Sequence, residues 1–213
     1  MTIKIGVIIP DRNDRPRFLA KCLEIISRQT LQPHFIEVVN DPARTHEKDI
    51  TWRYRIGYER LTAKGADVIL FIENDDWYAP NYIKTMIDRW IMLEKPFMIG
   101  TNNTLYYHIK SRKFLKIEHP RHSSAMNMVI SGGRWVDWGD DNNVFVDLHL
   151  WKKHIGILFD PKENISIGIK HGIGMTGGAA HDKDWKAFKL HDADGSFLKE
   201  TVGETDFNFY QSI

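Results

Sequence analysis

The stretch ADVILFIENDDWYAP, residues 66–80, places three carboxylates directly after an apolar run. The apolar run is typical of a buried strand, and Glu73, Asn74, Asp75 and Asp76 then follow within four positions. Neighbouring carboxylates repel one another, so a fold tolerates them only on a solvated turn or around a cation. The stretch therefore poses a choice between an ordinary turn and a metal site.

The composition is that of an ordinary globular protein. Of the 213 residues, 42% are hydrophobic and 27% are charged, and the net charge of +1 gives no sign of a nucleic-acid partner. Cys22 is the single cysteine, which excludes an internal disulfide and a cysteine-based zinc site. Because neither a membrane-length apolar run nor a signal-peptide pattern is present, we expect a soluble cytoplasmic protein.

Strands alternate with helices in the first half of the chain. We expect strands over 3–10, 33–41 and 66–73. We expect helices over 49–65 and 79–94, the latter with its proline in the first turn, and a helix after the polar turn 11–17 whose buried stripe holds Phe18, Leu19, Cys22, Leu23, Ile25 and Ile26. This alternation predicts a parallel α/β sheet.

The second half is less regular. Residues 96–117 resemble the strands of an antiparallel hairpin, 123–131 another strand, 143–155 a short helix, and 165–182 a strand that runs into a glycine-rich loop. No linker is apparent, so we expect one domain over residues 1–213.

Three predicted strands end in polar clusters, at residues 10–15, 40–41 and 73–76. In open α/β sheets, ligands bind at the carboxyl ends of the strands. If these strands are neighbours, the three clusters converge on one crevice.

GVIIPDRNDRPRFLAKCLEIISRQTLQPHFIEVVND, residues 6–41, and DVILFIENDDWYAPNYI, residues 67–83, resemble the nucleotide-sugar half of a family 2 glycosyltransferase with the GT-A fold. The order and spacing of a polar turn, a helix with Gln-Thr near its end and two acid-ending strands agree over about residues 3–90. The resemblance implies a GT-A (Rossmann-like) mixed, mainly parallel sheet with helices on both faces. It also implies that residues 1–100 bind the donor and residues 101–213 the acceptor.

The resemblance also implies roles for residues in the first half. The donor-binding positions would be Pro10, Arg12 and Asp14 along the base, Asp41 at the base or ribose, and Arg55, Asn74 and Asp76. Glu73 and Asp75 would hold the metal, although Glu73 replaces the usual first aspartate. RYRIG, residues 53–57, likewise departs from the family's Ala-Arg-Asn-x-Gly, with Tyr54 and Arg55 in the Arg and Asn positions.

A metal explains the acids chemically. A nucleotide sugar leaves as a diphosphate, and Mn²⁺ or Mg²⁺ neutralises its charge while bridging carboxylate and phosphate oxygens. We therefore favour a divalent metal site at residues 73–76, with Trp77 and Tyr78 packed under the following helix.

The second half must then supply the base and the remaining metal ligand. VFVDLHLW, residues 144–151, resembles the family's Glu-Asp-x-x-Leu-x-x-Arg helix, which makes Asp147 the expected base. His171 is the expected late metal ligand, with His181 as its rival. For Trp135 and Trp138, stacking on a ligand and ordinary packing remain open.

Together with the acid cluster, the resemblance implies a metal-dependent, inverting glycosyltransferase that uses a nucleotide sugar, most readily a UDP-sugar. One alternative is a nucleotidyltransferase of similar fold, although PDRNDRPR, residues 10–17, lacks its glycine-rich phosphate loop. Another is an inert sugar- or nucleotide-binding module, which the glutamate at position 73 favours. The sequence does not identify the molecule that carries the acceptor hydroxyl. A modified nucleic-acid base is one candidate acceptor, but the net charge of +1 gives it little support.

Overall fold

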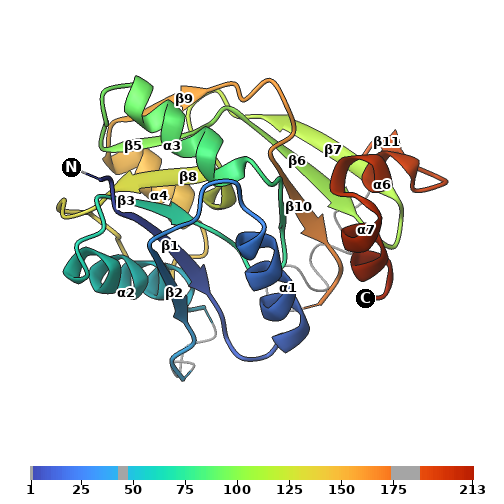
Figure 1. Cartoon of the computed structure of the whole chain (residues 1–213), viewed down its shortest axis with the longest axis horizontal. Helices are drawn as coiled ribbons and strands as arrows, with labels where there is room; N and C mark the ends of the chain where they lie inside the picture. The colour runs from blue at the N-terminus through green and yellow to red at the C-terminus, as the bar shows by residue number, and fades with distance from the viewer. Residues whose placement is uncertain (1, 43–47, 174–187) are drawn as a thin grey trace.

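The computed structural model describes residues 2–42, 48–173 and 188–213. In chain order its elements are β1 (Ile5–Pro10), α1 (Pro16–Ser27), β2 (Phe35–Val39), α2 (Ile50–Ala63), β3 (Val68–Phe71), β4 (Trp77–Tyr78), α3 (Tyr82–Met92), β5 (Met98–Thr101), β6 (Asn103–His108), β7 (Lys113–Glu118), the 3₁₀ turn η1 (Ala125–Asn127), β8 (Met128–Ser131), α4 (Val146–Lys153), β9 (Gly156–Phe159), β10 (Ser166–Lys170), β11 (Leu190–His191), α6 (Ser196–Val202) and α7 (Glu204–Gln211). Each strand and helix predicted in the first half is present (Figure 1).

The first sheet has the strand order β2-β1-β3-β8-β5-β9 within the described ranges. β1 lies parallel to both β2 and β3, and β5 lies parallel to β9. Only β8 runs antiparallel to its neighbours, β3 and β5. The sheet is therefore mixed and mainly parallel, as predicted.

Helices cover both faces of this sheet. Successive side chains of a strand point to opposite faces, so Val7 of β1 packs in one hydrophobic cluster with Ile25 of α1. Ile8 packs in a second cluster with Leu61 of α2 and Leu150 of α4. Because both faces are covered, β1 and β3 are buried along their whole length, which explains their unbroken apolar sequences.

A second sheet has the order β11-β7-β6-β10-β4 among the described strands. β6 and β7 form the antiparallel hairpin predicted within 96–117. β10 adds to it in parallel with β6 and antiparallel to β4, which the sequence did not predict. The C-terminal helices α6 and α7, red in Figure 1, lie on the side of the molecule where β7 and β11 are found.

Buried Asp206 fixes α7 to α1. Its carboxylate accepts hydrogen bonds from Arg28 at 2.8 and 2.9 Å, from Lys21 at 3.3 Å and from the Trp77 indole at 3.0 Å. Lys21 is consequently buried on α1, whereas Leu23, predicted on the buried stripe, is exposed. A polar partner 185 residues away overrides the apolar pattern at this helix.

Two local predictions are corrected. Pro80 lies outside α3, whose N-cap is Asn81, instead of in the first helical turn. The strand predicted over 123–131 begins only at Met128, because η1 precedes it. Within the described residues, no helix combines the length and apolar character needed to span a bilayer.

Candidate active site

Three polar loops meet at one edge of the first sheet, where β2, β1 and β3 end. The backbone amide of Asp11 donates to the carbonyl of Val39 at 3.1 Å, and the Asn13 side chain donates to the carbonyl of Asn40 at 2.8 Å. On the other side, the Asn74 amide donates to the Asp11 carboxylate at 2.7 Å. The predicted convergence of the three clusters is therefore confirmed, and we call this the carboxyl edge.

The acids lie where the chain leaves one sheet for the other. β3 ends at Phe71, and β4, which begins at Trp77, already pairs with β10 of the second sheet. The intervening acid turn, residues 73–76, is held by a 2.8 Å hydrogen bond from the Glu73 amide to the Tyr78 hydroxyl. Trp77 and Tyr78 are buried, as predicted, so the turn has little freedom to move the acids apart.

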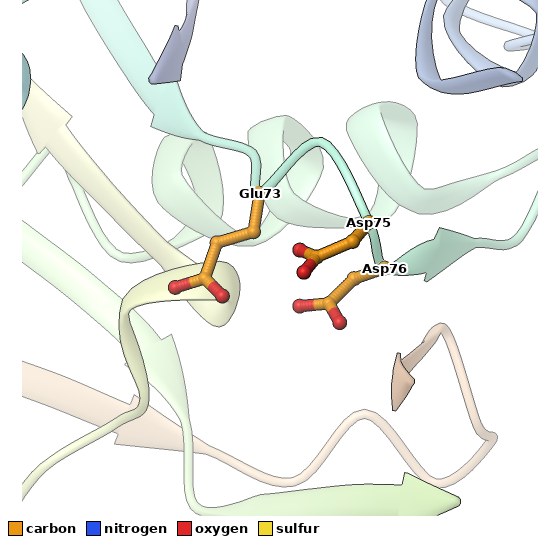
Figure 2. Close-up of side chains that lie close together, drawn as sticks. All are labelled: Glu73, Asp75 and Asp76. Carbon is orange, nitrogen blue, oxygen red and sulfur yellow. The ribbon is translucent and has the colours of Figure 1, made fainter. Parts of the chain in front are cut away.

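The three carboxylates of the acid turn face one space. Ligand oxygens of Glu73, Asp75 and Asp76 all lie within 4.8 Å of one another, the only such group among the described residues. Figure 2 shows the side chains of all three turned toward the same gap. The repulsion anticipated from the sequence is therefore present in the folded chain.

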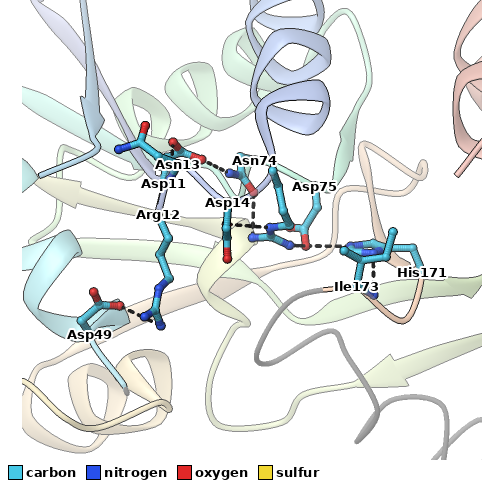
Figure 3. Close-up of polar contacts among 10 residues, drawn as sticks. Asp11, Arg12, Asn13, Asp14, Asp49, Asn74, Asp75, His171 and Ile173 are labelled. Carbon is cyan, nitrogen blue, oxygen red and sulfur yellow. Dashed lines mark hydrogen bonds and ion pairs between the residues drawn. The ribbon is translucent and has the colours of Figure 1, made fainter. Parts of the chain in front are cut away.

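Asp75 has two cationic or proton-donating partners. Its Oδ2 accepts hydrogen bonds from the guanidinium of Arg15 and from Nε2 of His171, the latter at 3.0 Å (Figure 3). Nδ1 of His171 accepts the backbone N–H of Ile173 at 3.1 Å, so the imidazole carries its proton on Nε2. The structure thus brings His171 to Asp75, as the metal hypothesis requires.

The pKa values of the acids diverge. Burial, reinforced by the charge of Asp75, raises the pKa of Glu73 to about 7. Burial and the charge of Glu73 raise the pKa of Asp76 well above its ordinary value. Burial also opposes ionisation of Asp75, but the His171 hydrogen bond and the Arg15 charge lower its pKa below the ordinary value. Lys170, at the end of β10, favours ionisation of all three.

The donor set fits a hard divalent cation. Oδ1 of Asp76 accepts the Ile169 N–H at 2.8 Å, but its buried Oδ2 has no hydrogen-bond partner. Such an oxygen is rare in a folded protein unless an ion or water satisfies it. Carboxylate oxygens are the ligands that Mg²⁺ and Mn²⁺ prefer.

His171 contacts one of these acids, Asp75, and lies outside the group of three carboxylates. The distance from Nε2 of His171 to Oδ2 of Asp75 is 3.0 Å. To bind the cation through Nε2, the imidazole would carry its proton on Nδ1 and give up the hydrogen bond from Ile173. His181 lies outside the described residues.

Asp147 lies in the first turn of α4. Burial raises its pKa, against the backbone amide of Leu148 and the charge of His122. The charge of Asp147 in turn contributes to the raised pKa of Glu73. A carboxylate whose pKa is raised accepts a proton more readily than one at its ordinary value.

The predicted donor residues divide into two groups. The first group lies at the carboxyl edge. Pro10 ends β1, and Asn74 and Asp76 belong to the acid turn. Oδ1 of Asp14 is 3.6 Å from Nε of Arg15. Arg12 lies at the same edge, with its guanidinium 3.6 Å from Asp49 (Figure 3).

Two other predicted donor residues are held by neighbours. Asp41 is clamped by the guanidinium of Arg60 through two 2.8 Å hydrogen bonds, which lower its pKa. Arg55 is not brought to the acid turn: it pairs with Asp141 at 2.9 and 3.0 Å and with Glu59 at 3.0 Å.

Sequence reasoning missed the cations of this site. Arg15 and Lys170 belong to stretches that were singled out, yet neither was assigned a role. Three neighbouring acids require compensating charge, and Arg15 in the turn after β1 was the available signal. Arg53, not Arg55, is the buried arginine of α2, and it donates to the Val39 carbonyl at 2.9 Å.

The two tryptophans whose roles the sequence left undecided differ in exposure. Trp138 is buried against Phe71, with ring centroids 6.2 Å apart, and is a packing residue. Trp135 is 80% exposed, so its side chain remains accessible to a ligand.

Several solved structures resemble this chain in fold, although its sequence matches no known family. No protein-family model and no curated protein sequence matches the chain. S. aureus TarS residues 1–349, in complex with UDP-GlcNAc, matches with a TM-score of 0.55 at 9% identity, over 82% of this chain and 60% of that chain. The complex with UDP gives 0.51 at 12% identity, over 78% and 60%. A glycosyltransferase involved in the glycosylation of the major capsid of PBCV-1 gives 0.44 at 13% identity, over 86% and 99%.

The likeness to TarS covers 82% of this chain, and it confirms the predicted architecture. The fold is GT-A-like. This GT-A-like chain spans only 60% of the length of the TarS fragment. At 9% identity the likeness shows the fold alone, so the roles of individual residues depend on the geometry described above.

The raised pKa of Glu73 makes stability depend on pH. Between its ordinary value of 4.5 and about 7, the folded state holds a proton that the unfolded state has released, so stability falls as pH rises through this window. In metal-free protein, Glu73→Gln should therefore show a smaller fall in the free energy of unfolding between about pH 5 and pH 8, measured by urea denaturation. Exposed Glu59→Gln should match the wild type. Equal falls in Glu73→Gln and wild type would contradict the assignment.

Proposed function

We propose that this chain is a metal-dependent glycosyltransferase that moves a sugar from a nucleotide-sugar donor to an acceptor hydroxyl. The observation that carries the proposal is the group of three converging carboxylates, with a buried unsatisfied oxygen, at the carboxyl edge of a GT-A-like fold. A bare solvated turn would leave these side chains exposed, whereas Asp76 is buried. A cytoplasmic location stays a prediction from the sequence.

The metal ligands would be Glu73 and Asp75, with His171 as the late ligand and Asp76 completing the oxygen set. A Mn²⁺ or Mg²⁺ ion held there would neutralise the negative charge of the departing diphosphate. For binding, Glu73 must lose the proton that its raised pKa retains, so we expect the cation to bind more tightly as pH rises toward 8.

The nucleotide would lie along the carboxyl edge, over the ends of β1 and β2. Arg12 and Asp14 offer charged groups there, and Pro10 an apolar surface for the base. Asp41, held rigid by Arg60, would accept a hydrogen bond from the base or ribose with its remaining lone pairs. The TarS complexes with UDP-GlcNAc and UDP support a UDP-sugar as the first donor to test.

The acceptor would be bound by the second half of the chain, residues 101–213. Its hydroxyl oxygen would form a bond to the anomeric carbon as the bond from that carbon to the diphosphate breaks, and Asp147 would take the hydroxyl proton. A single displacement of this kind inverts the anomeric configuration. Arg55, tied to Asp141, would contribute to the donor site only through the loop that carries Asp141.

The first test is Mn²⁺-dependent binding of UDP, measured by isothermal titration calorimetry. Asp75→Asn should abolish the Mn²⁺-dependent part, because it removes the ionised carboxylate of the metal group, while circular dichroism shows an intact fold. Asp88→Asn, an exposed change on α3, is the matched control. Unchanged Mn²⁺ dependence in Asp75→Asn would remove the metal assignment. Binding of UDP-sugars without any release of UDP would favour the inert module.

A second test concerns the base. Asp147→Asn should lower the turnover of the UDP-sugar by on the order of 10²–10⁴-fold, because a general base acts on the rate without holding the donor. UDP and Mn²⁺ affinities should stay near wild-type values. A variant with normal turnover, or one that loses donor affinity first, would show that Asp147 is not the base.

A further inference from the structure

Arg15 links the loop after β1 to the acid turn. It is the N-cap residue of α1, and its two terminal nitrogens donate separately, one to Oδ2 of Asp75 and the other to Oδ1 of Asn74 at 3.0 Å. Asn74 in turn donates to Asp11, so one chain of hydrogen bonds runs from β1 to His171 (Figure 3).

This guanidinium supplies the charge that a metal would otherwise supply. An arginine cannot release its proton in a protein, so its positive charge stays beside Asp75 in every state. A divalent cation brought to Asp75 meets that charge and must either displace the guanidinium or bind against its repulsion. Arg15 therefore opposes binding of the cation alone.

The side chain also has donors to offer a ligand. Its Nε is buried without a hydrogen-bond partner, and the side chain is 20% exposed at the carboxyl edge. The planar fork of a guanidinium matches the oxygens of a phosphate. A diphosphate brought to this edge would give Arg15 a new anionic partner once Asp75 is taken by the cation.

We propose that Arg15 makes cation binding depend on the donor: it holds Asp75 before the cation binds, and it transfers to the diphosphate when the cation takes Asp75. The inference deepens the proposed function and rests on it. The diphosphate removes the repulsion between Arg15 and the cation, and the cation frees Arg15 to bind the diphosphate. Each ligand therefore raises the affinity for the other by the same factor. The site then loads cation and donor together, and the cation alone binds weakly.

A purely structural role predicts something different. If Arg15 only oriented Asp75, its removal would weaken the binding of Mn²⁺ with and without nucleotide, because the ligand would lose its preferred position. The sign of the effect on Mn²⁺ alone separates the two roles.

The experiment is a titration of Mn²⁺ in the absence and presence of saturating UDP, and of UDP with and without Mn²⁺, by calorimetry on the full chain. Arg15→Gln should tighten Mn²⁺ binding in the absence of UDP by about tenfold, and should lower the coupling factor between Mn²⁺ and UDP by about the same factor. Arg17→Gln, the same charge change on α1 at a side chain bound to Ser212, should behave as wild type. Arg15→Lys keeps the charge without the fork, and should retain weak Mn²⁺ binding with reduced coupling. This variant also serves if Arg15→Gln fails to fold.

Each outcome is decisive. Weaker binding of Mn²⁺ alone in Arg15→Gln, or coupling equal to wild type in both Arg15 variants, overturns the role of Arg15 and leaves the proposed function standing. A wild-type chain that binds neither Mn²⁺ nor UDP overturns the proposed function, and the inference with it.

Discussion

Three carboxylates held together at the junction of two sheets are the constraint around which this molecule is arranged. The chain crosses from β3 to β4 through only the acid turn, and pairing on both sides prevents the turn from opening. Compensating charge must therefore come from elsewhere, and Arg15 in the first loop and Lys170 at the end of β10 provide it, while His171 donates a hydrogen bond to Asp75. Electrostatic interactions thus connect the loop after β1 to the second sheet.

The same arrangement separates the chemical tasks. Asp75 stays ionised because of its cationic neighbours, whereas Glu73 and Asp76 retain protons that a cation would release. Asp147 is close enough to act electrostatically on Glu73 but belongs to α4, on a different element from the proposed ligands. A metal site and a base on separate elements can hold the donor and deprotonate the acceptor independently, as a displacement at the anomeric carbon requires.

Much of the site could be predicted from local sequence, and the missing parts have physical reasons. Buried parallel strands produce unbroken apolar runs, so β1, β3 and the convergence of their ends were predictable. Pairings between distant segments leave no such local signal. The strand β10 was therefore expected from the sequence, but its pairing with β6 and β4 was not. From the sequence, Lys21 is expected on the exposed face of its helix. It is buried because Asp206 of α7 lies beside it. Of the two arginines in residues 53–57, Arg53 reaches the carboxyl edge, because the helical register turns Arg55 toward Asp141.

The central claim is that the acid turn binds a divalent cation together with a nucleotide diphosphate. The most direct measurement is an anomalous difference map from crystals grown with Mn²⁺ and UDP, recorded near the manganese absorption edge. The account predicts one strong peak among the carboxylates of Glu73, Asp75 and Asp76, in contact with the diphosphate oxygens. UDP bound at the carboxyl edge with no manganese peak at these carboxylates would contradict it.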